Sequence, residues 1–470
     1  MTSSNPVRSL FSAIARILHD KSGASATIVA IALPGLIGFG ALGAETGVWF
    51  TLKLQNQAAA DAAALSAAYQ IITEKTNVIS DLTPAASEAA RRNGYRGTTP
   101  AVVYPYSDSV VSNGVAVTLQ QTQGASLAAM FLPNVTVATK AVAVIEVFDN
   151  PCILALRTSG TGVEIADFTR LDMPNCSAVA NSISRSAIEL RGSTSSIAAA
   201  TLVTAGEVTL QGNPINPAAP PPEFTVASPV RIGAPNVVDP YARTLTHSYL
   251  TAGMPPSLRQ CGSTGSGGVT IYLGNCGIPG TTLLQSSIKL TGNTRISGDW
   301  SILSSQTVDL SPGTYWITGN LALQSSAVLK CSTCDNVKGT GVTIILPAEA
   351  GKIGVVSMAA DAVFNLNAPS SGRFPGVVMV QDANGLPAGT TYPSSPSSVT
   401  GAPGATLNGL VYFPISSLTF HGNPSVTGPK CLVWVVDTLL VDQTSSLETR
   451  GCATAGLTNL PTVSTVALAE

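Results

Sequence analysis

The sequence is poor in charged and aromatic residues. Of its 470 residues, 11% are charged and 5% are aromatic, whereas an ordinary globular domain has about 25% charged residues. The formal net charge is -2 at pH 7, so the chain lacks the basic face that a nucleic-acid-binding protein needs. We therefore exclude nucleic acid as a partner.

The usual signatures of catalytic and metal sites are also missing. The sequence has no P-loop and no Gly-x-Ser-x-Gly motif with a plausible histidine partner. Its three histidines are far apart: His19, His247 and His421. Cys331 and Cys334 have the spacing of zinc ligands, but no second such pair accompanies them. We expect no metal, no cofactor and no catalytic residue.

Isolated carboxylates are the remaining argument for an enzyme. Glycoside hydrolysis needs two carboxylates held about 5–10 Å apart. Asp437 and Asp442 are close in sequence, and Asp299 and Asp309 would approach each other if they lay on neighbouring β segments. Each of these residues is also typical of a turn or cap, which is the role we predict. A membrane-anchored polysaccharide-active enzyme is the alternative.

One long apolar run is present. Residues 24–44 contain no charged side chain, and at helical rise they match the ~30 Å hydrocarbon core of a bilayer. Glu45 and a single close lysine follow the run, whereas three basic residues precede it: Arg8, Arg16 and Lys21. We predict a single-pass inner-membrane helix with a cytoplasmic N-terminus and a periplasmic C-terminal domain. A cleaved secretory signal and a buried core helix are the alternatives.

Helical patterns also flank this run. Residues 1–23 carry apolar side chains at helical spacing around Arg16, which predicts an amphipathic segment on the cytoplasmic membrane surface, with a disordered tail as the alternative. No glycine or proline occurs between Val48 and Ile72, so the helix is expected to continue beyond the membrane. Residues 45–150 therefore predict a long helix followed by a small α/β module.

The residues after the apolar run carry a recognisable pattern. Gly43-Ala-Glu-Thr-Gly47 is followed by Leu54-Gln55 and then by Ala59-Ala-Asp-Ala-Ala-Ala-Leu65. This pattern resembles the N-terminal region of TadG-like proteins of the Tad (tight adherence, Flp) pilus-assembly system. The resemblance implies an inner-membrane anchored, periplasm-facing structural or assembly component of a pilus. It also implies that the module is pilin-like and that the inner membrane and other pilus-assembly or pilin-like proteins are partners.

The eight cysteines form four groups of sequence neighbours. An exported location favours disulfides, and our hypothesis is that neighbours pair, although the sequence leaves the connectivity open. The expected bonds are Cys152 with Cys176, Cys261 with Cys276, Cys331 with Cys334, and Cys431 with Cys452. Zinc binding is the alternative for these cysteines.

From residue 151 onward, short β-branched runs alternate with polar turns. Gly-Asn recurs after such runs, as in Leu290-Thr-Gly-Asn293 and Ile317-Thr-Gly-Asn320, and both residue types accept positive φ. This repetition predicts a right-handed parallel β-helix, with a β-sandwich or jelly roll as the alternative. The whole chain is therefore expected to be α+β.

We expect four parts in this β-rich region. They are a first β segment at 151–213, a Pro-rich linker or insertion at 214–240, a β-solenoid domain at 241–455 and a flexible tail at 456–470. Besides the enzyme, a surface adhesin or glycan-binding protein is an alternative function. Envelope polysaccharide is then a possible partner of the β domain.

Overall fold

The computed structural model describes residues 21–74, 78–109, 111, 113–125, 129, 133–148, 151–166, 168–192, 194–256, 261–266, 269–273, 276–283, 287–335, 338–401, 405–422, 431–443, 445–446, 452–453, 456–457 and 463–469. The chain divides into two compact units. Unit 1 is Met1–Ile145 with Val466–Glu470, and unit 2 is Glu146–Thr465. The expected amphipathic segment, 1–23, lies almost entirely outside the described residues.

Unit 1 begins with one continuous helix, α2, at Lys21–Glu74. Its 54 residues are ~80 Å long, far longer than a bilayer core. The stretch Val29–Ile72 contains a window long and apolar enough to cross a membrane. Ile31 and Phe39 are 75% and 79% exposed, as expected for side chains that contact lipid. The helix is therefore a candidate single membrane span that continues beyond the membrane.

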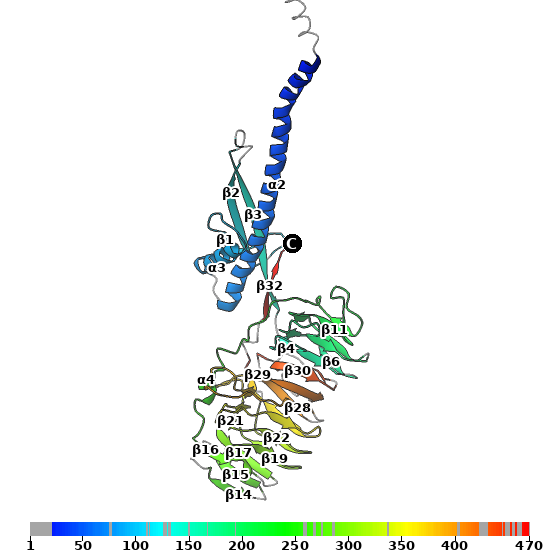
Figure 1. Cartoon of the computed structure of the whole chain (residues 1–470). Coiled ribbons are helices and arrows are strands. Elements are labelled where there is room, and N and C mark those ends of the chain that lie inside the picture. The colour runs from blue at the N-terminus through cyan, green and yellow to red at the C-terminus, as the bar shows by residue number, and fades with distance from the viewer. Residues whose placement is uncertain are drawn as a thin grey trace, which may run out of the picture. The chain divides into compact units, whose positions relative to one another are not determined.

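The second half of α2 packs with α3 against a small sheet (Figure 1). The helix α3 is Ile79–Arg92, and the strands are β1 (Ala101–Tyr106), β2 (Gly114–Gly124), β3 (Asn134–Phe148) and β32 (Val463–Leu468). The sheet order is β1-β2-β3-β32, and the β1/β2 and β2/β3 pairs are antiparallel. Unit 1 is thus a small α/β module with one long helix.

The end of the chain differs from the flexible tail expected at 456–470. Residues Val463–Leu468 form β32 beside β3, and the Ala469 amide donates to the Val142 carbonyl at 2.9 Å. Val466 is only 5% exposed and belongs to the core of unit 1. The two valines and the threonine of this segment favour a strand, and the edge of β3 supplies backbone partners.

Unit 2 is built from parallel sheets. Apart from a hairpin at each end, its strands pair in parallel, for example Ile288 with Val308 and Val308 with Leu329. A first series of paired strands contains β15 (Val269–Leu273), β17 (Ser287–Thr291), β20 (Thr307–Leu310), β23 (Val328–Lys330), β26 (Val363–Asn367) and the start of β29 (Thr406–Gly422).

A second series runs through the whole unit. It contains β16 (Cys276–Pro279), β18 (Thr294–Ser297), β21 (Gly313–Ile317), β24 (Val342–Leu346), β27 (Val377–Gln381), β29, β30 (Leu432–Val441), β4 (Pro151–Ala155), β7 (Ser177–Ala180) and β10 (Leu202–Thr204). Several of these strands are buried along their whole length, including β4, β24 and β27. Burial on both faces is typical of parallel sheets.

The remaining strands form shorter series. One contains β19 (Trp300–Ile302), β22 (Leu321–Leu323) and β25 (Val356–Met358). Another contains β28 (Ser397–Gly401), the second half of β29, β30, β5 (Val163–Ile165), β8 (Ile188–Leu190) and β11 (Val208–Leu210). A third contains β31 (Ser445–Ser446), β6 (Arg170–Met173), β9 (Ser196–Ala199) and β13 (Phe224–Val226).

The order of the strands in space differs from their order in the chain. In β30, Trp434 lies opposite Ile153 of β4 and Leu439 lies opposite Val163 of β5. The first strands of unit 2 are therefore added to its last strands, and a single sheet of the described residues contains both. The segments expected at 151–213 and 241–455 thus form one body (Figure 1).

Both ends of this stack carry a short antiparallel hairpin. At one end β12 (Asn213–Pro214) pairs with β11, and at the other β14 (Ser263–Ser266) pairs with β15. The stretch 214–240 is more than a linker, because it contributes β12 and β13 and because Val237 exchanges two backbone hydrogen bonds with the Asn181 side chain. Short helices follow: α4 (His247–Thr251) and a 3-10 turn at Gly280–Thr282.

The recurrent Gly-Asn corners connect neighbouring layers. Gly292 has a positive φ of +67°, a conformation that favours glycine. Gly319 leaves no room for a side chain, because a Cβ there would lie 2.5 Å from the Gly298 carbonyl carbon. The Asn293 Oδ1 accepts from the Thr314 amide at 3.0 Å. In the next corner, the Asn320 Oδ1 accepts in the same way from the Val355 amide of the following layer. The repeated motif thus pairs backbone groups at the corners.

Candidate functional site

The alanine-rich part of α2 forms the packing face of unit 1. Six of its alanines have no exposed surface: Ala59, Ala60, Ala63, Ala64, Ala67 and Ala68. They share a core with Leu82 of α3 and with Val117 and Leu119 of β2. Because alanine is small, the helix backbone approaches these elements closely, and a larger side chain would force them apart.

Polar residues just before this face hold the helix in register with the sheet. The Gln57 Nε2 donates to Asp61 Oδ1 at 2.9 Å and to the Lys140 carbonyl at 3.2 Å. The Thr139 hydroxyl donates to the Asn56 carbonyl at 3.1 Å. These contacts join α2 to β3, so the amide-rich residues that follow the apolar run have a clear structural role.

All eight cysteines are paired. The bonds are Cys152–Cys176, Cys261–Cys276, Cys331–Cys334 and Cys431–Cys452. Each bond joins sequence neighbours, as hypothesised. With both sulfurs of each pair oxidised, no thiolate remains for the alternative of zinc binding.

Two of the carboxylates considered for catalysis accept hydrogen bonds from the backbone of the next layer. Asp299 Oδ1 accepts from the Asn320 amide and Asp309 Oδ1 from the Ser332 amide, both at 2.8 Å. Asp299 lies between β18 and β19, whereas Asp309 lies within the strand β20 and not in a turn. Asp309 also lies between two lysines of the neighbouring strands, Lys289 and Lys330.

The other two carboxylates contact side chains outside their own segments, an arginine for Asp437 and a histidine for Asp442. Arg157 Nε donates to Asp437 Oδ2 at 2.9 Å, and this contact raises the pKa of the guanidinium. His421 Nδ1 lies 2.7 Å from Asp442 Oδ1. Asp437 and Asp442 therefore bind different partners.

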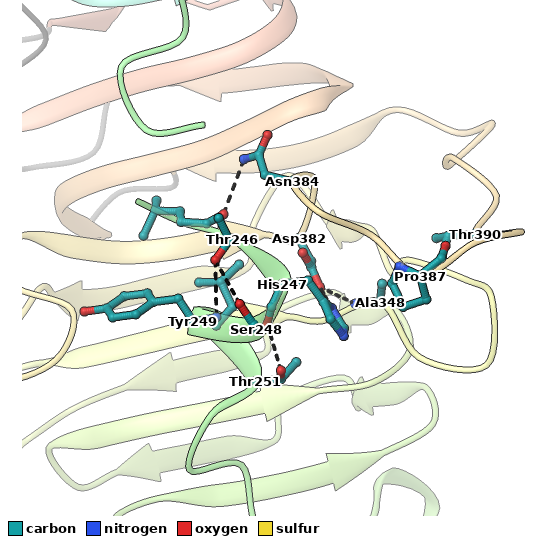
Figure 2. A network of polar contacts seen from close by, with 12 residues as sticks. Thr246, His247, Ser248, Tyr249, Thr251, Ala348, Asp382, Asn384, Pro387 and Thr390 are labelled. Carbon is teal, nitrogen blue, oxygen red and sulfur yellow. Dashed lines mark hydrogen bonds and ion pairs between the residues drawn. The ribbon is translucent and has the colours of Figure 1, made fainter. Parts of the chain in front are cut away.

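A second histidine forms a more buried pair. His247 opens α4, and its Nδ1 lies 2.5 Å from Oδ2 of Asp382, whose side chain is fully buried. The same carboxylate oxygen accepts from the Ala348 amide at 3.0 Å. Figure 2 shows α4 and Asn384 meeting here, where the His247 amide donates to the Asn384 carbonyl at 2.7 Å. The contacts fix α4 on the loop that follows β27.

A partly buried chain of hydrogen bonds continues from this point. Asn384 Nδ2 donates to the Tyr412 hydroxyl at 2.7 Å, and that hydroxyl donates to Asp239 Oδ2 at 2.5 Å. Burial raises the pKa of Asp239, and the hydrogen bond from Tyr412 only partly offsets this effect. Burial beside Asp239 also raises the pKa of Tyr412. The network thus attaches residues 239–251 to the outer face of the sheet.

An aspartate beside a histidine is one part of a hydrolytic triad. Among the described residues, however, no serine, threonine or cysteine forms a hydrogen bond with the His247 ring, and the hydroxyls of Thr246 and Ser248 lie 3.3 Å from each other. Over the same described ranges, no three His, Cys, Asp or Glu side chains gather as metal ligands would. The observed geometry is that of a structural attachment.

Sequence reasoning did not find these histidine pairs. His247 and Asp382 are 135 residues apart, and His421 and Asp442 are 21 apart. Neither spacing matches a local motif. The first pair depends on the path of residues 227–256 across the stack, and no sequence signal indicated that path.

Comparison with known proteins concerns the N-terminal region. Residues 23–70 match the family model described as Putative Flp pilus-assembly TadE/G-like. No curated protein and no solved structure matches the chain. The matched residues are the part of α2 that runs from the apolar stretch to the alanine face. The N-terminal region of this chain is therefore similar to the TadE/G-like family at residues 23–70.

Proposed function

We propose that this chain is an inner-membrane anchored, periplasm-facing structural or assembly component of a Tad (Flp) type pilus. One observation carries the proposal. The family match at 23–70 coincides with a helix whose first half is apolar and exposed and whose second half is the packing face of unit 1. A single rigid helix therefore connects the membrane segment to the module.

The proposed orientation rests on charge. Arg8, Arg16 and Lys21 precede the apolar run, while Glu45 follows it, and positive flanks remain in the cytoplasm. The four disulfides of unit 2 support the same orientation, because disulfides persist in the periplasm. The partners would be the inner membrane and other pilus-assembly or pilin-like proteins.

Unit 2 would act as a rigid scaffold in the form of a right-handed parallel β-helix. Parallel pairing throughout the stack supports a β-helix, since β-sandwiches and jelly rolls are built from antiparallel strands. We further propose that it performs no catalysis. Asp299, Asp309 and Asp437 have structural partners that account for their positions.

Membrane topology and pilus formation test this function. Protease added to spheroplasts should degrade unit 2, and reversing the charge of Arg8, Arg16 and Lys21 to glutamate should reduce this accessibility. Deleting the gene should reduce the number of surface filaments, and the intact gene should restore it. Protection of unit 2 in spheroplasts would contradict the orientation, and unchanged filaments would contradict the pilus role.

A further inference from the structure

A second long stretch of the chain lacks charged residues, in addition to the apolar run at 24–44. Residues 109–139 contain no charged side chain. They include all of β2, the connection after it and the first part of β3. The connection, 125–133, has the sequence Ala-Ser-Leu-Ala-Ala-Met-Phe-Leu-Pro, without the Gly, Asn or Asp that turns facing water prefer. The hairpin of β2 and β3 is therefore most apolar in sequence where it turns.

A contact between β3 and α2 sets the height of this hairpin along the helix. The Thr139 hydroxyl donates to the Asn56 carbonyl at 3.1 Å, and the two strands extend from there along α2 toward its N-terminal half (Figure 1). Asn134, where β3 begins, lies five residues before Thr139, which is ~17 Å at strand rise. The same distance equals about 11 residues of helix. The strand β3 therefore begins near the level of Glu45.

The exposure of α2 gives the same level independently. Glu45 is 8% exposed and Asn56 is fully buried, and Trp49 and Leu52 between them are half-buried. Spacings of three and four residues place these side chains on one face of the helix. Figure 1 shows β2 and β3 beside this part of α2. One face of the helix is thus covered as far as Glu45.

The uncovered side of α2 is apolar at this level. Val48, Phe50 and Leu54 are 55%, 62% and 57% exposed, and the first basic residue after the apolar run is Lys53. Exposed aromatic and aliphatic side chains followed by a lysine are typical of the membrane interface. On the proposed topology, the membrane surface therefore meets α2 between Glu45 and Leu54, where the hairpin ends.

The backbone of the hairpin suits contact with lipid. Gly124 pairs with Asn134, and the Ala125 amide donates to the Pro133 carbonyl at 3.1 Å. The backbone groups between the two strands are thus paired up to the turn, which lowers the cost of contact with a bilayer. Ala129 lies beyond this last pair in an exposed turn.

We propose that the end of the β2/β3 hairpin, which carries Ala125, Ala129 and Pro133, contacts lipid of the periplasmic leaflet beside α2. The inference rests on the proposed membrane span of α2 and adds a second element of unit 1 that binds the bilayer. A single helix is free to rotate about its own axis in a membrane, whereas a second contact prevents this rotation. The hairpin would therefore orient the small α/β module relative to the membrane surface.

Spin labels at three positions test the contact. The full-length chain is reconstituted in vesicles of phosphatidylethanolamine and phosphatidylglycerol, and one introduced cysteine carries the label. The native cysteines are all bonded, so the introduced thiol is the only free one. Ala129→Cys reports on the hairpin end, and Ala101→Cys, which is exposed on β1, is the control in the same module. Phe39→Cys, at a position 79% exposed on α2, reports on the span.

Power saturation of the electron paramagnetic resonance signal compares collisions with oxygen, which concentrates in lipid, and with a water-soluble nickel complex. Position 129 should favour oxygen, as position 39 does, whereas position 101 should favour the nickel complex. If position 129 matches position 101 while position 39 is in lipid, the hairpin contact is wrong and the span of α2 stands. If position 39 also favours the nickel complex, the span fails and the hairpin contact fails with it.

A charge at the hairpin end provides a second test with the same label at position 129. Ala125→Asp adds a carboxylate that is costly to place in a bilayer, so the accessibility at position 129 should shift to the value measured at position 101. Ala101→Asp is the matched control and should leave position 129 unchanged. Hydrogen exchange of α3 verifies that both variants keep the fold of the module. An accessibility at position 129 that Ala125→Asp does not change would show that lipid does not surround the hairpin end, and would overturn the proposal.

Discussion

All eight cysteines of this chain lie in unit 2, whereas unit 1 has none and is organised around the alanine face of α2. The strands of unit 2 are mostly three to five residues long, and its bonds join segments separated by 3 to 24 residues. Unit 1 instead has one helix of 54 residues. A long helix needs no covalent support, while a stack of short strands gains stability from local cross-links.

Reduction of the disulfides should produce the largest difference in stability between the two units. Treatment with a thiol reductant should destabilise unit 2 by about 2–4 kcal/mol for each disulfide and leave unit 1 unchanged. Three of the four tryptophans, Trp300, Trp316 and Trp434, lie in unit 2, so fluorescence-detected denaturation reports mainly on that unit. Hydrogen exchange of α2 and α3 reports on unit 1. Equal destabilisation of both units would contradict this difference.

Enlarging a side chain of the alanine face should destabilise unit 1 and leave unit 2 unchanged. Ala64→Leu places extra volume in a closely packed contact and should destabilise unit 1 by about 1–3 kcal/mol. Ala58→Leu is the matched control, because Ala58 is exposed on the same helix and the change should be nearly neutral. Hydrogen exchange of α3 distinguishes them. If both variants exchange like the wild type, the alanine face is not tightly packed.

The sequence predicted the elements of unit 1 better than the path of unit 2. In unit 1, helix continuity followed from the absence of glycine and proline between Val48 and Ile72. In unit 2, the cysteine pairs agreed with the hypothesis that neighbours pair, although the sequence left the connectivity open. The pairing of β4 with β30 was not predictable, because the spacing of strands in the sequence indicates repeated layers but not which layers lie next to each other. The strand role of Val463–Leu468 was missed because a terminal segment gains its partner only from tertiary contact.

The two histidine–aspartate pairs allow a comparison within unit 2. His247→Ala leaves the fully buried Asp382 without its ring partner and should cost about 1–3 kcal/mol. His421→Ala affects a pair in which each side chain is about 30% exposed and should cost less than about 1 kcal/mol. Chemical denaturation of the two variants tests this order. Equal losses would mean that burial of Asp382 does not determine its energetic importance.

The smallest expected effect is on the pH dependence of stability. It compares two aspartates whose pKa values are shifted in opposite directions. Burial raises the pKa of Asp239, so its stabilising contribution is present below the unfolded-state pKa and is lost as pH rises through the folded-state pKa. Hydrogen bonds from Ser325 and Ser326 lower the pKa of Asp361, so its contribution is present above the unfolded-state pKa and is lost as pH falls through the folded-state pKa.

Replacing each aspartate with asparagine removes its titration, so the two variants should shift the pH profile in opposite directions. Relative to wild type, Asp239→Asn should gain stability as pH rises from about 4 to 8, because the wild type then carries a buried charge. Asp361→Asn should lose stability relative to wild type at lower pH, as pH rises from about 2 to 4 through the lowered folded-state pKa toward the unfolded-state pKa. Denaturant midpoints measured across both ranges test the two variants. Parallel profiles for the two variants would mean that the raised pKa of Asp239 does not contribute to the stability of the folded chain, and that its hydrogen bond from Tyr412 compensates fully for burial.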